Sequence, residues 1–155
     1  MCVRIVVADQ SEARFYDLER RGAPLRPAGS LKDPAARLHD RDFKSDRPGR
    51  VFDRAPAVGA RRGASARHGT GGERRPRRHQ AELFARRIGR QLDQDRRARR
   101  FDSITLVAGA PFLGILRAQL PEPVRALITS TVARDLVHQP ESVLRSHLPP
   151  RRKYP

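Results

Sequence analysis

The clearest hydrophobic pattern of the chain lies in residues 101–120. Residues 103–108 form an uncharged run of β-branched and aliphatic side chains, which is typical of a strand buried on both faces. Gly109 then frees the backbone, and Pro111 suits the first turn of a helix, where its missing N–H costs nothing. The apolar residues that follow at helical spacing are Phe112, Leu113, Leu116 and Leu120. This segment therefore predicts a strand, a glycine turn and a helix that packs back onto the sheet.

Three further strands are predicted in the N-terminal part of the chain. Residues 3–8 form an apolar run interrupted only by Arg4, and residues 13–18 alternate as a half-exposed strand does. Residues 25–31 predict a weaker third strand, which Pro27 restricts to a sheet edge because proline cannot donate to the ladder. The turns between these runs are short, so we expect an antiparallel meander.

Helical periodicity resumes at His79. The apolar stripe of this helix consists of Ala81, Phe84, Ala85, Ile88 and Leu92. Arginines occupy the opposite side, which indicates an amphipathic helix with one face on a core. Further along, residues 129–136 are predicted to form the last strand, and Pro140 opens a short final helix.

These elements predict an α/β fold in a single domain over residues 1–150, followed by a tail at 151–155. Strands 3–8 and 103–108 should lie adjacent and parallel at the centre of the sheet, because both are apolar on two faces. Residues 33–78 show almost no periodicity and are rich in glycine, proline, arginine and aspartate. We therefore predict a long basic loop there.

Composition adds a large excess of positive charge. The chain has 33 Lys and Arg against 17 Asp and Glu, a formal net charge of +16. Such a charge favours a polyanionic partner, nucleic acid first and an anionic membrane second. Residues 61–100 hold 14 arginines and 4 acids, so they carry most of the excess.

The arginines are candidate phosphate ligands, because the planar guanidinium matches a phosphate through two hydrogen bonds. The candidate nucleic-acid-binding residues are Arg61, Arg62, Arg67, Arg74, Arg75, Arg77, Arg78, Arg86 and Arg90. The alternative is a solvated charge run that reflects only a genome rich in arginine codons. Aromatic residues make up 5% of the chain, too few for a base-stacking sheet.

Cysteine usage and hydropathy indicate the compartment. The single cysteine, Cys2, cannot form an internal disulfide and fits a reducing environment. No run of the sequence approaches the roughly 20 apolar residues of a membrane span. We therefore expect a cytoplasmic protein.

The sequence carries no obvious catalytic or metal-binding motif. Its five histidines show no metal-ligand spacing with cysteine or carboxylate, and no nucleophile stands beside a base. Asp9 follows the first strand, where α/β folds place functional carboxylates, although a single carboxylate there is more often a turn or cap residue. We predict no metal, no cofactor and no enzymatic activity.

Several blocks of the sequence resemble the bacterial host attachment protein family. They are Val-Val-Ala-Asp (6–9), Glu-Ala-Arg-Phe-Tyr (12–16), Ser-Asp-Arg-Pro-Gly-Arg-Val-Phe (45–52), Ala-Glu-Leu-Phe-Ala (81–85), Leu-Val-Ala-Gly-Ala-Pro-Phe-Leu-Gly-Ile-Leu-Arg (106–117) and Arg-Asp-Leu (134–136). The family motif residues are Asp9, Ser45, Asp46, Arg47, Pro48, Gly49 and Arg50. The resemblance runs over most of the chain, and the blocks at 45–52 and 106–117 are the more specific ones.

The family is related to the middle domain of class-1 peptide release factors and of Pelota. The resemblance implies a ribonuclease-H-like fold, a mixed five-stranded sheet with helices on both faces, here with a long basic loop. In release factors a Gly-Gly-Gln tip between the third strand and the next helix enters the peptidyl-transferase centre. Gly71, Gly72 and Glu73 form the loop tip in the corresponding connection. A carboxylate cannot donate an amide proton, so hydrolysis by that mechanism is not expected.

Two functions follow as hypotheses. The first is a cytosolic factor that binds the ribosome, tRNA or other structured RNA through the arginines of the loop and the following helix. The alternative is an attachment or surface-interaction factor that contacts protein, anionic glycan or lipid. A peptidyl-tRNA hydrolase is a distant third.

Overall fold

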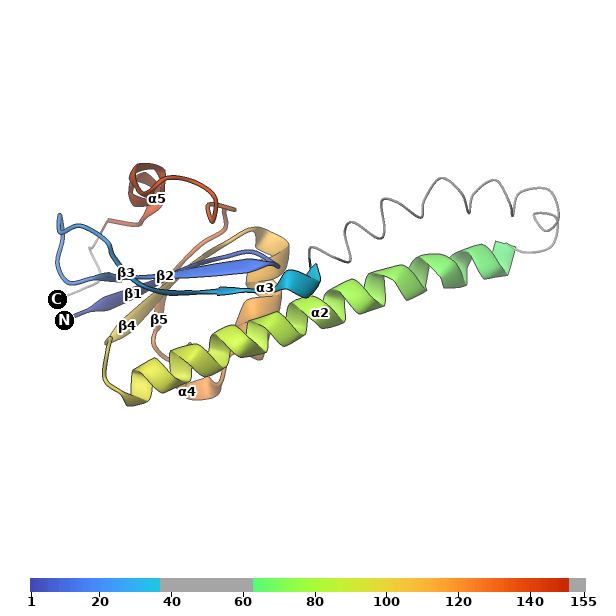
Figure 1. Cartoon of the computed structure of the whole chain (residues 1–155), viewed down its shortest axis with the longest axis horizontal. Helices are drawn as coiled ribbons and strands as arrows, with labels where there is room; N and C mark the ends of the chain where they lie inside the picture. The colour runs from blue at the N-terminus through green and yellow to red at the C-terminus, as the bar shows by residue number, and fades with distance from the viewer. Residues whose placement is uncertain (37–62, 151–155) are drawn as a thin grey trace.

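The computed structural model describes the backbone of residues 1–36 and 63–150 and the side chains of residues 1–36 and 76–150 (Figure 1). Five strands form one mixed sheet in the order β3-β2-β1-β4-β5. They are β1 (Val3–Ala8), β2 (Glu12–Leu18), β3 (Arg26–Lys32), β4 (Ser103–Ala108) and β5 (Ile128–Val132). Strand β1 pairs antiparallel with β2 and parallel with β4, so it joins an antiparallel half of the sheet to a parallel half.

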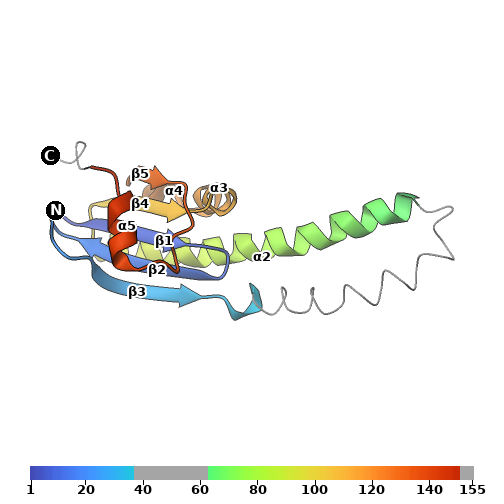
Figure 2. The ribbon, with the colours of Figure 1, turned by 90° about the horizontal axis from the view of Figure 1, so that it is seen from above.

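Helices cover both faces of this sheet (Figure 2). The helices are α2 (Gly63–Arg97), α3 (Ala110–Gln119), α4 (Glu122–Arg125) and α5 (Glu141–His147). Helices α2, α3 and α4 lie on one face, and α5 lies on the other. Within the described ranges, no helix combines the length and the apolar character that a bilayer crossing requires.

The alternation of side chains along β1 divides the core into two layers. Val6 and Ala8 pack with Phe84, Ile88 and other apolar residues of α2 and α3. The side chains of β1 that point the other way pack under α5 with Leu144. A strand that must be apolar on both faces reads as a continuous hydrophobic run, as residues 3–8 do.

The predicted centre of the sheet is confirmed. Strands β1 and β4 are parallel neighbours, in register from the pair Val3 and Ser103 to the pair Ala8 and Ala108. Strand β3 lies at an edge, as Pro27 required. The last strand is shorter than predicted: it ends at Val132, because the next three residues are exposed and leave the ladder.

The prediction of a loop over residues 33–78 is wrong for residues 63–78, which form the first part of α2. Hydrophobic periodicity could not detect this part, since its apolar side chains are only alanines and one proline, Pro76. Five of these sixteen residues are glycine or proline, which are the poorest helix formers, so propensity did not indicate a helix there either. Residues 34–36 form a short helical turn after β3, so the loop prediction is wrong there too, whereas residues 37–62 and the predicted tail lie outside the described residues.

Arg4 interrupts the apolar run of β1 and is nevertheless only 1% exposed. Its Nε donates to Asp17 Oδ1 at 2.6 Å, its Nη1 donates to Asp95, and its guanidinium lies 4.9 Å from the centroid of the Phe101 ring. Burial alone would lower the pKa of Arg4, but the hydrogen bonds to Asp17 and Asp95 raise it above its ordinary value. This ionic cluster ties β1 to β2 and to the end of α2.

Candidate functional site

Helix α2 presents two chemically different faces along its C-terminal half. The buried positions contact the sheet and α3, and all five residues of the predicted apolar stripe are buried. Arg86, Arg90 and Arg97 stand four and seven residues apart, so they share a stripe opposite the buried one. All three are exposed. We call Arg86, Arg90 and Arg97 the arginine row.

Neighbouring groups hold several guanidinium groups on this side of the molecule. Arg86 Nε donates to Gln119 Oε1 of α3 at 2.9 Å, and Arg97 Nε lies 2.9 Å from Asp93 Oδ2. Beside the row, Arg87 Nη1 donates to the carbonyl oxygen of Lys32 at 3.2 Å. Each of these contacts uses only part of the five N–H donors of a guanidinium. These exposed arginines therefore keep N–H donors that the contacts do not use, and a phosphate oxygen could accept hydrogen bonds from them.

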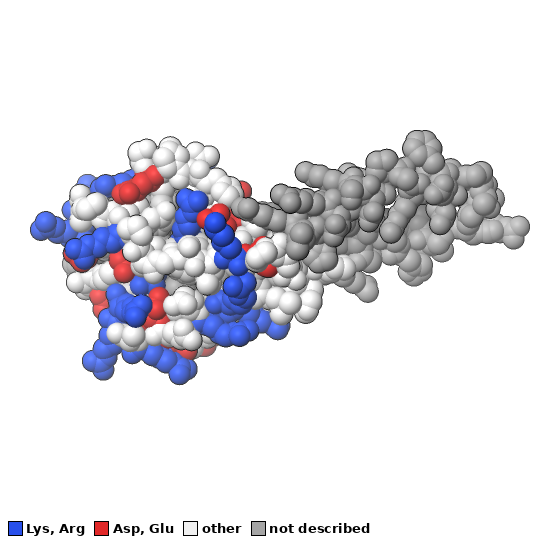
Figure 3. Space-filling model, in the orientation of Figure 1, with Lys and Arg blue, Asp and Glu red and all other residues white. Residues whose placement is uncertain are grey.

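Positive charge dominates the surface around the row. Residues 77–100 include nine arginines and three acids. Of the acids, Asp95 is buried with Arg4, while Asp93 is paired with Arg96 and Arg97. The hydrogen bond from Arg96 and the charge of both arginines lower the pKa of Asp93. Figure 3 shows basic side chains spread over the face of the molecule on which α2 packs against the sheet.

The structure accounts for the predicted nucleic-acid-binding residues in three groups. Arg77, Arg78, Arg86 and Arg90 have described side chains, and all are exposed. Arg67, Arg74 and Arg75 stand on the backbone of α2, and Arg61 and Arg62 lie outside the described residues. The sequence prediction missed Arg97, although its seven-residue spacing from Arg90 places it on the same stripe.

The prediction of a loop tip at residues 71–73 is wrong, because these residues are part of the same helix. Gly71, Gly72 and Glu73 lie inside α2 and not at a turn between elements. Glycine is the poorest helix former after proline, so a run with two adjacent glycines predicted a turn. The family motif residues from Ser45 to Arg50 lie outside the described part of the chain.

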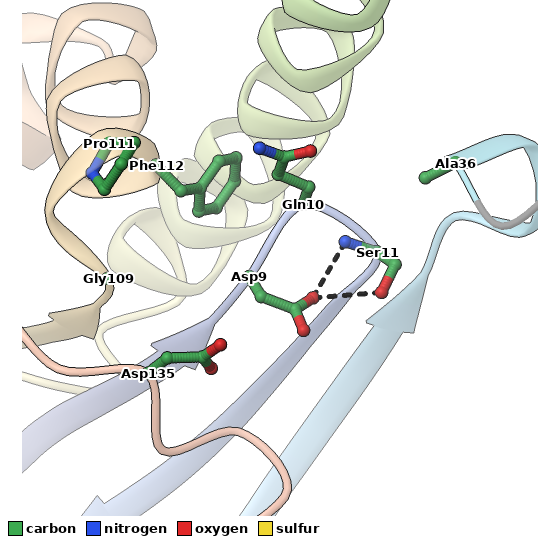
Figure 4. Close-up of a pocket in the computed structure, with 8 residues that line it drawn as sticks. All are labelled: Asp9, Gln10, Ser11, Ala36, Gly109, Pro111, Phe112 and Asp135. Carbon is green, nitrogen blue, oxygen red and sulfur yellow. Dashed lines mark hydrogen bonds between the residues drawn. The ribbon is translucent and has the colours of Figure 1, made fainter. Parts of the chain in front are cut away.

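A second feature is a pocket of about 320 Å³ at the carboxyl ends of β1 and β4 (Figure 4). Its lining consists of Asp9, Gln10, Ser11, Ala36, Gly109, Pro111, Phe112 and Asp135. Ligands of open α/β sheets commonly bind at this position, outside the ends of parallel strands. Its two carboxylates come from the β1–β2 turn and from the segment after β5.

Asp9 serves the turn between β1 and β2. Its Oδ1 accepts hydrogen bonds from the backbone N–H of Ser11 at 2.8 Å and of Glu12 at 2.7 Å, and also from the Ser11 hydroxyl. Its other oxygen lies 3.4 Å from Nε2 of His138. Among the described residues, no group of three or more His, Cys, Asp or Glu could hold a metal ion. The geometry therefore explains Asp9 as a turn residue.

Comparisons with known proteins show the family. No curated protein matches the sequence. A solved chain described as "Archaeal protein" is similar, at 11% sequence identity and a TM-score of 0.46. The likeness covers 94% of this chain and 35% of that one, so this chain spans about a third of the length of that protein. The family model Host_attach, described as "Protein required for attachment to host cells", matches residues 4–148, and the chain therefore belongs to the host attachment family.

Proposed function

We propose that the protein binds structured RNA, free or within the ribosome, through the arginine row and the basic residues of α2 that precede it. The observation that carries this proposal is the position of Arg86, Arg90 and Arg97. They lie exposed on one stripe of a helix whose opposite stripe is buried in the core. A rigid support fixes the spacing of the guanidinium groups, which makes multiple phosphate contacts possible at one time.

An anionic membrane fits this surface less well than a nucleic acid. A helix that lies on a bilayer inserts an apolar face between the headgroups. The apolar stripe of α2 is occupied by the sheet and α3, and Leu83 is the only large hydrophobic residue of α2 exposed among those described. The side of α2 that faces solvent therefore offers charge and a single large apolar side chain, which is too little for an apolar face.

The resemblance to the release-factor middle domain supports a role in translation without hydrolysis. The observed mixed five-stranded sheet with helices supports this proposal at the level of the α/β class. Glu73 takes the place of the glutamine, and its segment is helical. We therefore propose a binding protein of the cytoplasm and not a peptidyl-tRNA hydrolase.

The description of the family favours a second candidate, an attachment factor that contacts a host surface through protein or anionic glycan. The same arginines would then meet sulfate or carboxylate groups in place of phosphates. Cell fractionation separates the two: sedimentation with ribosomes at low salt supports RNA binding, whereas recovery from the envelope or the medium supports attachment.

The direct test replaces the arginine row by glutamine, in the triple variant R86Q/R90Q/R97Q. A matched control, R20Q/R21Q/R26Q, removes the same charge from exposed positions around the β2–β3 turn. Each set contains one arginine that is ion-paired, Arg97 with Asp93 and Arg26 with Glu19.

We expect the row variant to bind an RNA hairpin more weakly and with a smaller dependence on salt. Each lost phosphate contact reduces the slope of log affinity against log salt by roughly 0.7 to 0.9, so three lost contacts reduce it by about two to three units. The control variant should change both quantities by much less. Equal losses in the two variants would mean diffuse attraction to a highly basic protein and would refute a site on α2.

A further inference from the structure

We infer that the surface of α2 recognises double-helical regions of RNA through their phosphates, without reading base sequence. This inference rests on the proposed RNA binding and specifies the form of RNA that the surface accepts. It depends on three properties of the described residues. The aromatic rings are buried, the arginine row follows a straight line, and neighbouring groups hold guanidinium groups in or beside the row.

The aromatic residues of the described chain are withdrawn from solvent. Phe15, Phe84, Phe101 and Phe112 are all at most 5% exposed, and Tyr16 is half-buried in β2. Proteins that hold single strands stack successive bases on exposed aromatic rings along a basic groove. The described surface supplies basic groups without such rings, so it has little means to hold unstacked bases.

The arginine row follows a straight line. Arg86 and Arg97 are eleven positions apart, and at 1.5 Å per residue the row spans about 17 Å. A duplex carries one charge per roughly 1.7 Å of its axis, so a stretch of this length holds about ten phosphates at regular positions on its two strands, and the row faces those on one side. A flexible single strand has to be straightened to present its charges to the same line, which costs conformational entropy.

Two contacts fix guanidinium groups beside or within the row. Arg86 is held by Gln119 on α3, and Arg87 is held by the Lys32 carbonyl while it lies 5.6 Å from the centroid of the Phe84 ring. Groups held in place match a rigid phosphate array with little further loss of side-chain entropy. Contacts to phosphates position a protein on a helix but carry no base information. We therefore expect binding that depends on RNA form and not on sequence.

The experiment compares three probes of equal length by fluorescence anisotropy: duplex RNA, the same sequence as single-stranded RNA, and a duplex RNA of scrambled sequence. At near-physiological salt we expect the protein to bind both duplexes equally, and about tenfold more tightly than the single strand, because the duplex holds more phosphates per unit length in fixed positions. Duplex DNA of the same sequence is the fourth probe. It should bind within a few-fold of duplex RNA, because both present phosphates.

The variants decide whether the preference belongs to α2. R86Q/R90Q/R97Q should lose most of the duplex preference, whereas R20Q/R21Q/R26Q should keep it, with circular dichroism showing that both fold. A single strand bound as tightly as the duplex would overturn this inference, as would a preference that survives in the row variant. Absence of any RNA binding by the unmodified protein would overturn the proposed function instead.

Discussion

The two halves of helix α2 differ in what supports them. In residues 79–97, which we call the packed half, a stripe of apolar side chains is buried against the sheet and α3. Residues 63–78, the projecting half, extend past the sheet, and their sequence contains no large apolar side chain except Pro76 (Figures 1 and 2). The comparison separates two tasks: the packed half attaches the helix to the core, and both halves carry arginines. Core stability and charge presentation can therefore be altered separately.

The largest effect is expected from the packed half. Ile88→Ala, and equally Leu106→Ala in the strand beneath, should destabilise the protein by about 2–5 kcal/mol, because both side chains are fully buried and their removal leaves a cavity. Urea denaturation followed by circular dichroism measures the difference in free energy of unfolding. A loss smaller than about half a kcal/mol would show that α2 is not attached as the structure indicates.

Removal of charge from the projecting half should have the opposite effect: RNA affinity should change and stability should not. Glutamine at Arg74, Arg75, Arg77 and Arg78 together should leave the unfolding midpoint nearly unchanged, since exposed charges contribute little to stability. RNA affinity should fall, and the salt slope should decrease by about three units if all four contact phosphates.

The control for this variant is a second quadruple substitution at exposed positions elsewhere. Those positions are Arg20, Arg21, Arg26 and Arg134. If the control variant loses as much RNA affinity and as much of the salt slope, the projecting half has no special role in RNA binding. If only the row variant of the packed half has an effect, binding is confined to residues 86–97.

A smaller effect concerns pH. The pKa of Asp93 is lowered in the folded state, chiefly by the hydrogen bond from Arg96, below its ordinary value of 3.8. The pair therefore stabilises the packed half above that value, and this contribution is lost as the pH falls through the lowered pKa. Asp93→Asn should remove this part of the acid sensitivity in melts recorded between about pH 5 and about pH 2.5. Identical pH profiles of the two proteins would contradict the pairing.

The smallest effect is expected for Glu73→Gln. The substitution restores a glutamine after two glycines, but the segment is helical, so neither stability nor RNA affinity should change appreciably. A ribosome assay should detect no peptidyl-tRNA hydrolysis by the unmodified protein. Robust turnover there would refute the proposal that it acts by binding alone.

The same contrast explains how far the sequence predicts the structure. Continuous apolar runs identified β1 and β4, and helical spacing identified the packed half with every residue of its buried stripe. The projecting half was missed because a helix without an apolar face produces no periodic signal. Its glycines and proline favoured a loop, and only the three-dimensional structure shows that the helix continues through them.

The ionic cluster around Arg4 shows a second limit of prediction. Arg4 appeared only to interrupt a buried strand, whereas its partners Asp17 and Asp95 are 13 and 91 residues away in the chain. A buried charge requires such partners, but the sequence does not state which distant carboxylates provide them. By contrast, Arg86 and Arg90 were predictable, since they lie opposite the apolar stripe of a helix that periodicity identifies, although Arg97 on the same stripe was missed.

The most direct test of binding by α2 is chemical crosslinking of the native protein to RNA in cells, followed by sequencing of the RNA and mass spectrometry of the crosslinked peptides. Digestion at acidic residues, and not at arginine, keeps the relevant peptides long enough to assign. The account predicts recovery of RNA with base-paired structure and crosslinks concentrated in residues 63–97. Recovery of no RNA above an uncrosslinked control, or crosslinks that lie mainly outside α2, would contradict it.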